Sequence, residues 1–258
     1  MFEEFLRFVD KIAPTWFVFE NVYGLTKFKN GEENIQNHIE NRFRDIGYTV
    51  KSKILYASDF GVPQRRNRLF IVGNRNGIDF EFPKEFDYSV SVDEAISDLP
   101  VLGNGEIQMK GEYTVPFEQA SPYVQLMRKK SKAPTQNIVS RNKDYVVERY
   151  KYIGQGENWS SIPDRLMENY ADKKRCHSGI YKRLIGGKPS VVISNYRKSM
   201  LIHPHQDRGL SVREAARLQS FPDHFIFEGP VSYVQQQIGN AVPPLLAKAV
   251  MKKILTYK

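Results

Sequence analysis

The sequence contains very little cysteine: Cys176 is the only one among its 258 residues. A disulfide framework within the chain is therefore excluded, and a reducing cytoplasm is the natural setting. No apolar run approaches the length of a membrane span, and the N-terminus lacks the basic-then-apolar pattern of a secretory signal. Internal repeats, low-complexity tracts and the Gly-x-Gly-x-x-Gly turn of dinucleotide-binding proteins are missing as well. We therefore expect a cytoplasmic globular protein.

Positive charge is abundant and unevenly placed. The chain carries a formal net charge of +9, and residues 122–198 hold 17 Lys and Arg against 6 Asp and Glu. The remainder holds 21 against 23, so the excess lies in one central basic block. Aromatic, amide and hydroxyl residues are interleaved with this charge, a mixture that suits contacts with phosphates and bases. An ordinary solvated surface of a basic protein explains the same composition, and composition alone does not decide between the two interpretations.

The apolar periodicity predicts alternating helices and strands before the basic block and helices after it. We expect a helix at 2–9, a buried strand at 16–19, a helix at 32–46 and strands at 48–56 and 68–72. The last two strands have no helix between them and should pair antiparallel, within a parallel or mixed sheet covered by helices. Further helices are expected within 91–100, with Ser91 as N-cap, and at 211–219, 231–238 and 242–255.

Two motifs suggest chemistry. Glu20 closes an apolar run and is followed by Asn21 and a glycine turn, in the stretch FENVYGL. Gln64, Arg66 and Arg68 alternate with other residues where a strand begins, and a period of two places their side chains on one face. Three donors on one face suit a phosphate or a carbonyl oxygen. A solvent-facing edge strand protected by charge gives the same pattern.

Taken together and in order, the motifs resemble those of the DNA (cytosine-5) methyltransferase family. The matching stretches are ENV (20–22), Gln-x-Arg-x-Arg (64–68), DEAISDLP (93–100), GENWSSIP (156–163), GIYKRL (179–184), KPSVVI (188–193), SVREAARLQSFPD (211–223) and QQQIGNAVPPLLAKAV (235–250). The resemblance covers nearly all of the chain. It implies an α/β fold: the C-terminal part of a doubly wound, Rossmann-like class I methyltransferase sheet, with a smaller mixed target-recognition domain. The implied domains are 1–80 (partial catalytic domain), 81–205 (target recognition) and 206–258 (helical return that completes the catalytic domain).

The resemblance also implies roles for the residues that match. Glu20 would contact N3 and the exocyclic amine of a flipped cytosine, which requires a carboxyl group that is partly desolvated and can be protonated near neutral pH. Arg66 and Arg68 would hold the target nucleotide, Arg68 through cytosine O2. Asn21 would support the turn after the strand, and Gln64 would line the same pocket.

The remaining matches concern the cofactor and the DNA. Asn240 would contact S-adenosyl-L-methionine, with Val242 near it, although a helix N-cap would also explain an asparagine at this position. The basic block would enter the major groove of double-stranded DNA and choose the sequence, which would associate the protein with the nucleoid. In that region Ser190 and Val191 stand where the family has Thr followed by an aliphatic residue, and this departure affects the contact expected there.

The nucleophile of this chemistry is not among the matching residues. The family reaction needs a thiolate that adds to cytosine C6, but neither the Pro-Cys-Gln motif nor the Phe-x-Gly-x-Gly cofactor turn occurs in the sequence. Cys176 has cationic neighbours, which can lower a thiol pKa, but it lacks the flanking Pro and Gln. We therefore expect a packing or surface role for it. His203 and His205 have no further ligands beside them, so no metal site is predicted.

Three hypotheses follow. The first is the C-terminal subunit of a split cytosine-5 methyltransferase, inactive until an N-terminal partner subunit brings the cofactor turn and the cysteine; it predicts an unpaired sheet edge near residues 16–20. The second is a truncated remnant that binds DNA without modifying it. The third is an RNA target, since a related branch of the family methylates tRNA; the long basic block favours duplex DNA.

Overall fold

The computed structural model of the protein describes residues 2–27, 29–30, 33–168, 178–194, 196–198 and 200–257. Its helices are α1 (Phe2–Ile12), α2 (Ile35–Asp45), α3 (Val92–Ile96), α4 (Pro122–Arg128), α5 (Asp144–Tyr150), α6 (Val212–Leu218), α7 (Val231–Asn240) and α8 (Pro244–Leu255). Its strands are β1 (Trp16–Val22), β2 (Lys29–Asn30), β3 (Glu33–Asn34), β4 (Thr49–Tyr56), β5 (Asn67–Asn74), β6 (Ile107–Lys110) and β7 (Thr135–Ile138). No helix within these ranges is long and apolar enough to cross a membrane.

A three-stranded sheet organises the N-terminal part, in the order β1-β5-β4. β5 pairs antiparallel with both neighbours, so the predicted antiparallel pairing of the last two strands is confirmed. β1 and β4 consequently run in the same direction on either side of β5, which makes the sheet mixed in direction. Among the described residues no strand pairs with the other side of β1, so this strand is one edge of the sheet.

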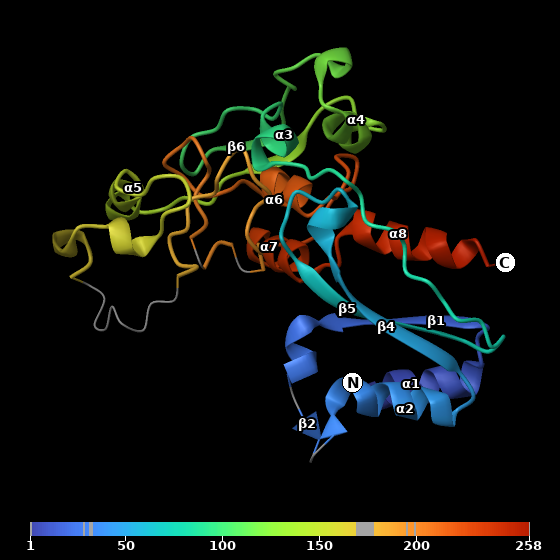
Figure 1. The fold of residues 1–258 in the computed structure, drawn as a ribbon. Coiled ribbons are helices and arrows are strands. Elements are labelled where there is room, and N and C mark those ends of the chain that lie inside the picture. The colour runs from blue at the N-terminus through green and yellow to red at the C-terminus, as the bar shows by residue number, and fades with distance from the viewer. Residues whose placement is uncertain are drawn as a thin grey trace.

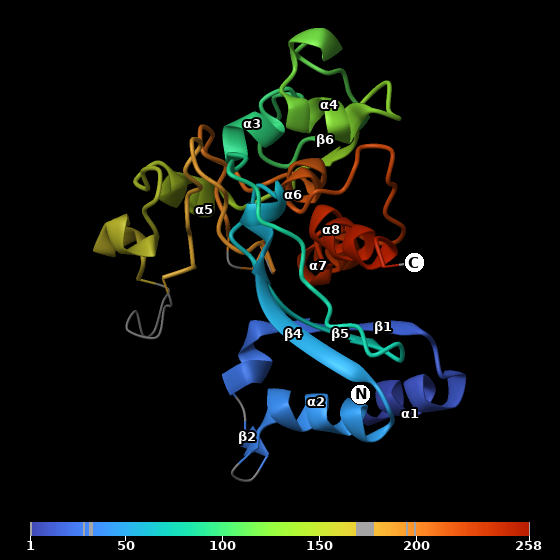
Figure 2. The ribbon, with the colours of Figure 1, turned by 45° about the vertical axis from the view of Figure 1, so that its right-hand side comes forward.

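Helices cover both faces of this sheet. Figures 1 and 2 show α1 and α2 on one face and α8 on the other. The alternation along β1 explains this: Phe17 and Phe19 pack with α1 and α2, whereas Trp16 and Val18 pack toward α8. A Cβ on Gly73 would lie 2.1 Å from Phe17 Cε1, so only glycine lets that ring lie across β5. The fold is therefore α/β, in three layers.

The remaining chain forms a second, larger core. One apolar cluster joins α3, α4, β7, α6 and α7, and it includes Leu201 and Leu210 on either side of the predicted domain boundary at residue 205. A smaller cluster surrounds α5. Because packing continues across residue 205, residues 206–238 share a core with the preceding segment, whereas α8 returns to the sheet. The division into three domains stays a prediction.

Local capping explains several helix starts. Ser91 Oγ accepts a hydrogen bond from the Glu94 backbone N at 3.1 Å, which confirms the predicted N-cap of α3. Ser211 and Glu214 form a reciprocal capping box at the start of α6. The predicted start of α2 was three residues early, because Asn34 caps the helix through Gln36 N. The short hairpins β2–β3 and β6–β7 were not predicted.

Candidate active site

Glu20 and Arg68 form the centre of the candidate site. Glu20 is opposite Phe70 in the ladder, and Val22 is opposite Arg68, so the two side chains are diagonal neighbours on adjacent strands. Arg68 Nε lies 2.6 Å from Glu20 Oε1. Both belong to the sheet face that α8 covers, since the period of two places them with Val18 and Phe70. The resemblance predicted that both residues hold the same base, and the structure brings them together.

The surroundings of this pair shift the pKa of both side chains. Burial raises the pKa of Glu20, and the positive charge of the Arg68 guanidinium opposes this rise. Burial likewise lowers the pKa of Arg68, and Glu20 opposes that shift. The Glu20 side chain is still 25% exposed, so a ligand can reach it. A carboxyl group with a raised pKa next to a fixed cation can donate a proton and accept a hydrogen bond at one place.

Arg66 is buried more deeply than its predicted role suggests. It precedes β5, is 1% exposed, and its Nε and Nη1 atoms have no hydrogen-bond partner among the described residues. A buried guanidinium without partners is costly, and such groups often mark a site that another molecule completes. Whether Arg66 holds the target nucleotide stays a prediction.

Gln64 does not line an open pocket. Its side chain is fully buried: Nε2 donates to Gln219 Oε1 at 2.6 Å, and Oε1 accepts from Ile193 N at 3.2 Å. The adjacent backbone bridges to Ser190, through Arg65 N to Ser190 O at 2.8 Å and Ser190 N to Pro63 O at 3.0 Å. Both ends of the Gln64 amide are thus hydrogen-bonded inside the protein. Gln64 therefore connects the start of β5 to the predicted recognition segment.

Gln219 completes this connection and was not recognised from the sequence. It is fully buried, and its Nε2 donates to Ile238 O at 2.8 Å and to Ala241 O at 3.0 Å. A continuous chain of side-chain hydrogen bonds thus runs from the loop at Ile193, through Gln64 and Gln219, to the turn that carries Asn240. The available signal was its place in the SVREAARLQSFPD motif, next to a helix whose seven residues are all buried.

Asn240 is the last residue of α7, not the N-cap of the final helix. The cap of α8 is Pro243, which makes no side-chain hydrogen bond, so the N-cap explanation is wrong. Asn240 is exposed and borders a cavity of about 460 Å³ together with Tyr233 and Gln236. Val242 packs at the edge of the cluster between sheet and α8. The lining of this cavity is mostly polar and does not include Val242, so the cofactor role of the two residues stays a prediction.

A glycine determines how closely the predicted recognition segment approaches α7. A Cβ on Gly239 would lie 1.7 Å from Ser194 O, so any larger residue would push the two segments apart.

Val191 is 37% exposed and lines a cavity of about 320 Å³ with Lys182 and Ser194. At the other end of the site, Asn21 Oδ1 accepts from Val22 N at 2.8 Å, consistent with support of the chain after β1.

Part of the basic block's charge is internal. Arg128, Arg149 and Arg183 are each more than 90% buried. Arg183 alone donates to the backbone oxygens of four residues and pairs with Asp207 at 2.6 Å. These arginines stabilise the predicted recognition region and are not free to bind phosphate. Cys176 lies outside the described residues.

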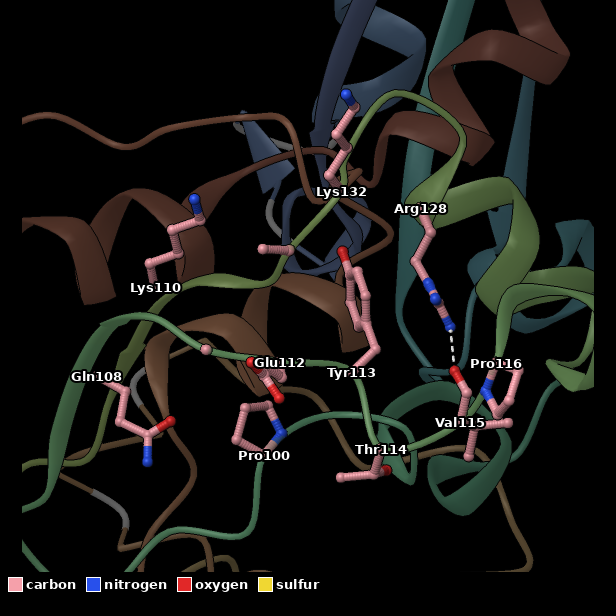
Figure 3. A pocket seen from close by; sticks show the side chains of 12 residues that line it. Pro100, Gln108, Lys110, Glu112, Tyr113, Thr114, Val115, Pro116, Arg128 and Lys132 are labelled. Atoms are coloured by element: carbon pink, nitrogen blue, oxygen red, sulfur yellow. Dashed lines mark hydrogen bonds between the residues drawn. The ribbon is translucent and has the colours of Figure 1, made fainter.

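Another large cavity contains none of the candidate site residues. It measures about 990 Å³ and is bordered by the segment 110–116, α4 and the following loop. Figure 3 shows Arg128 donating to Val115 O, with Lys110 and Lys132 among the lining side chains. Arg128 also lies 3.8 Å above the Tyr113 ring. The lining is polar and places Glu112 beside Lys110 and Lys132.

Known proteins resemble this chain over nearly its whole length. The family model for C-5 cytosine-specific DNA methylase matches residues 1–256. The chain is 35% identical to Type II methyltransferase M1.HphI of Haemophilus parahaemolyticus (99% of the chain, 60% of the relative). It is 33% identical to M.DdeI of Desulfomicrobium norvegicum (100% and 66%). It is 32% identical to M.MthTI of Methanothermobacter thermautotrophicus (97% and 69%).

Solved structures show the same fold. The match to a DNA modification methyltransferase encoded within a prophage (E. coli) has a TM-score of 0.69 at 24% identity, over 98% of this chain and 72% of that one. S. pombe Dnmt2 methyltransferase matches with a TM-score of 0.51 at 14% identity, over 99% and 71%. The chain spans 60–66% of the length of the first three curated relatives. With the family match extending over residues 1–256, the chain belongs to the C-5 cytosine-specific DNA methylase family.

Proposed function

We propose that this chain corresponds to the C-terminal portion of a DNA (cytosine-5) methyltransferase and supplies target-base binding and DNA recognition. A partner polypeptide would supply the nucleophilic cysteine and most of the cofactor site. The observation that supports the proposal is the Glu20–Arg68 pair, held at 2.6 Å on an edge strand, in a chain without the Pro-Cys-Gln motif. The proposed setting is the cytoplasm, with chromosomal DNA as the substrate.

The pair matches one edge of cytosine. O2 and N3 are neighbouring positions on the ring, and the exocyclic amine is adjacent to N3. Arg68, a permanent cation, donates to O2, while Glu20 donates a proton to N3 and accepts from the amine. Fixing the two groups on adjacent strands keeps them in register with the base before it arrives, so little ordering is needed on binding.

The reaction uses the raised pKa of Glu20. As the partner's thiolate forms a bond to C6, ring electrons move toward N3, which takes the proton from Glu20. S-adenosyl-L-methionine supplies the methyl group that C5 receives. A base then removes the C5 proton, the bond from sulfur to C6 breaks, and N3 returns its proton to Glu20. In this chain Asn240 and Val242 would hold one end of the cofactor.

The open edge of β1 is the proposed contact with the partner polypeptide. Free N–H and C=O groups on a strand edge accept another strand. Two exposed apolar residues one turn apart, Phe8 (53%) and Ile12 (69%), lie on α1, which packs on β1. Met251 (47%) and Leu255 (56%), also one turn apart, lie on α8 on the opposite face of the sheet. Apolar helix surfaces beside an unpaired strand suit a partner that continues all three layers.

Methyl transfer to mixed-sequence plasmid DNA tests the proposal directly. The chain alone and a mixture with the polypeptide encoded immediately upstream are assayed with S-adenosyl-L-methionine. We expect activity only in the mixture, unchanged by Cys176→Ser. Activity of the chain alone, or its loss with Cys176→Ser, would contradict the partner cysteine.

DNA binding by the isolated chain separates the recognition role from the catalytic one. We expect its DNA affinity to fall roughly 10³-fold between 50 and 200 mM salt, as neutralisation of several phosphates requires. No activity in either assay together with salt-dependent DNA binding would indicate a non-catalytic binding protein. A flat salt response would count against DNA recognition by the basic block.

A further inference from the structure

A second cavity, of about 590 Å³, lies away from Glu20 and Arg68. It is enclosed by the 3-10 turn Ala57–Phe60, the segment 86–90, α3, α4 and α8. Four aromatic rings line it: Phe60, Phe86, Tyr88 and Tyr123. Its volume is in the range of small-molecule sites, and such sites combine apolar walls with a few polar groups. None of the residues assigned individually to base or cofactor binding lines it, although Pro122, Tyr123 and Leu126 on its wall belong to the central basic block.

The rim of this cavity exposes aromatic surface to water. Phe86 is 45% exposed and Tyr88 58%, and their rings stack at 5.3 Å with an interplanar angle of 16°. The segment is fixed, since Phe86 N donates to Asp59 O at 2.8 Å. Gly61, beside the rings, has a φ of +75°, a left-handed backbone conformation that favours glycine. A preformed aromatic face of this kind is suited to stacking with a planar ring.

Three charged side chains around the same cavity have no ion pair or hydrogen bond to another side chain within the described part of the molecule. Lys248 and Lys252 are one turn apart on α8, about 6 Å along the helix axis. Glu94, from α3, is half-buried and lines the same space. By contrast the neighbouring Lys253 approaches Glu81 at 3.7 Å and does not line the cavity.

We propose that this cavity binds a nucleoside phosphate. The base stacks on the aromatic side chains, its exocyclic amino group donates to Glu94, and the phosphates accept from Lys248 and Lys252. A neutral apolar ligand would leave all three charges unpaired, and a simple aromatic acid would leave Glu94 unpaired. A nucleotide with an amino-bearing base satisfies all three. The site is independent of methyl transfer, so it can fail or hold without affecting the proposed function.

Isothermal titration of the chain with ADP tests the proposal. We expect saturable one-site binding, at least tenfold weaker binding of adenosine, which lacks phosphate, and no site-specific binding of ribose 5-phosphate, which lacks the base. Inosine 5′-diphosphate, whose base has no exocyclic amine, should bind more weakly than ADP. The variant Glu94→Gln should reduce that difference.

Matched variants of α8 identify the cavity. Lys248→Glu with Lys252→Glu should weaken ADP binding at least tenfold, whereas Lys253→Glu, on the same helix but outside the cavity, should leave it unchanged. Tyr88→Ala removes an exposed ring without disturbing the core and should also weaken binding. Equal binding of ribose 5-phosphate and ADP, or equal effects of the three lysine changes, would overturn the proposal. So would binding of an octathymidylate but not of ADP, because the cavity would then belong to a nucleic-acid surface.

Discussion

Replacing Arg217 by methionine should be among the most damaging single changes in the chain. Arg217 is fully buried on α6 and pairs with Asp223 at 2.6 Å and with Asp98 at 2.8 Å. It also donates to Ala95 O at 2.8 Å. The hydrophobic replacement fills similar space but leaves two buried carboxylates without their main cation. Removing one partner of a buried pair costs about 3–5 kcal/mol, a large fraction of a total stability of about 5–15 kcal/mol.

The pH dependence gives this prediction a specific signature. Burial alone raises the pKa of Asp223, but the bonds from Arg217 outweigh it and hold the pKa below its ordinary value. In the native chain Asp223 therefore contributes stability above its unfolded pKa, and this is lost only as the pH falls through the lower folded pKa. In the Arg217→Met variant the guanidinium no longer opposes burial, so burial should raise the pKa of Asp223 above its ordinary value. The loss in free energy of unfolding caused by Arg217→Met should then become smaller as the pH falls from 7 to 5, because the buried Asp223 carboxyl becomes protonated.

Urea unfolding followed by circular dichroism at pH 7 and pH 5 measures this effect. A loss of about 4 kcal/mol with a slope of about 2 kcal/mol per molar urea would lower the midpoint by roughly 2 M. Arg7→Met is the matched control, because Arg7 forms an exposed pair with Glu4 and its loss should cost less than about 1 kcal/mol. A deficit below 1 kcal/mol for Arg217→Met, or one that grows toward pH 5, would refute the reasoning.

Three further predictions concern other parts of the chain. Glu20→Gln should lower methyl transfer by the completed enzyme about 10²–10⁴-fold while DNA affinity stays unchanged; weakened DNA binding would instead point to a structural role. Gln219→Leu leaves the Gln64 amide and two backbone carbonyls without their partner, so urea unfolding should show a loss of about 2–4 kcal/mol, and a loss under 1 kcal/mol would mean that water replaces these bonds. Burial lowers the pKa of His203 to about 4. Below pH 6.5 His203 is therefore protonated in the unfolded chain but stays neutral in the folded chain until the pH approaches 4. Stability should fall by about 3 kcal/mol between pH 7 and 4, and His203→Gln should remove most of this slope; an unchanged slope would assign it to other groups.

Much of the secondary structure was predictable because its determinants are local. Ser91 and Ser211 cap their helices through residues three positions away, and the alternation along β1 distributes its aromatic side chains between two faces. The antiparallel pairing of β4 and β5 followed from the short connection between them. In each case the interacting residues are close together in the sequence, so a local sequence pattern is enough to predict the feature.

The polar interior was not predictable, because its partners are far apart in the chain. Arg217 meets Asp98 across 119 residues, and Gln64 meets Gln219 across 155. Arginine and glutamine are mostly exposed in proteins, so nothing in the sequence indicated that Arg217 and Gln219 would be buried. The same limitation affected Gln64 in the candidate site: the period of two predicted that its side chain shares a face with Arg68. In the structure the Gln64 amide is buried and bonded to Gln219, whereas Arg68 pairs with Glu20.

The strand order has a consequence for how the chain can fold during synthesis. β5 is made last of the three strands and must enter between β1 and β4, which cannot bond to each other across the gap. Until residue 74 has emerged, both earlier strands lack their partner, and until α8 is complete, Phe70 and Val72 lack the helix that packs on their face of the sheet. Contacts between this face and α8 are thus delayed, and long-range packing of this kind slows folding and exposes apolar surface on the way. The face of the sheet toward α8 is therefore the last part of the sheet to gain its native packing.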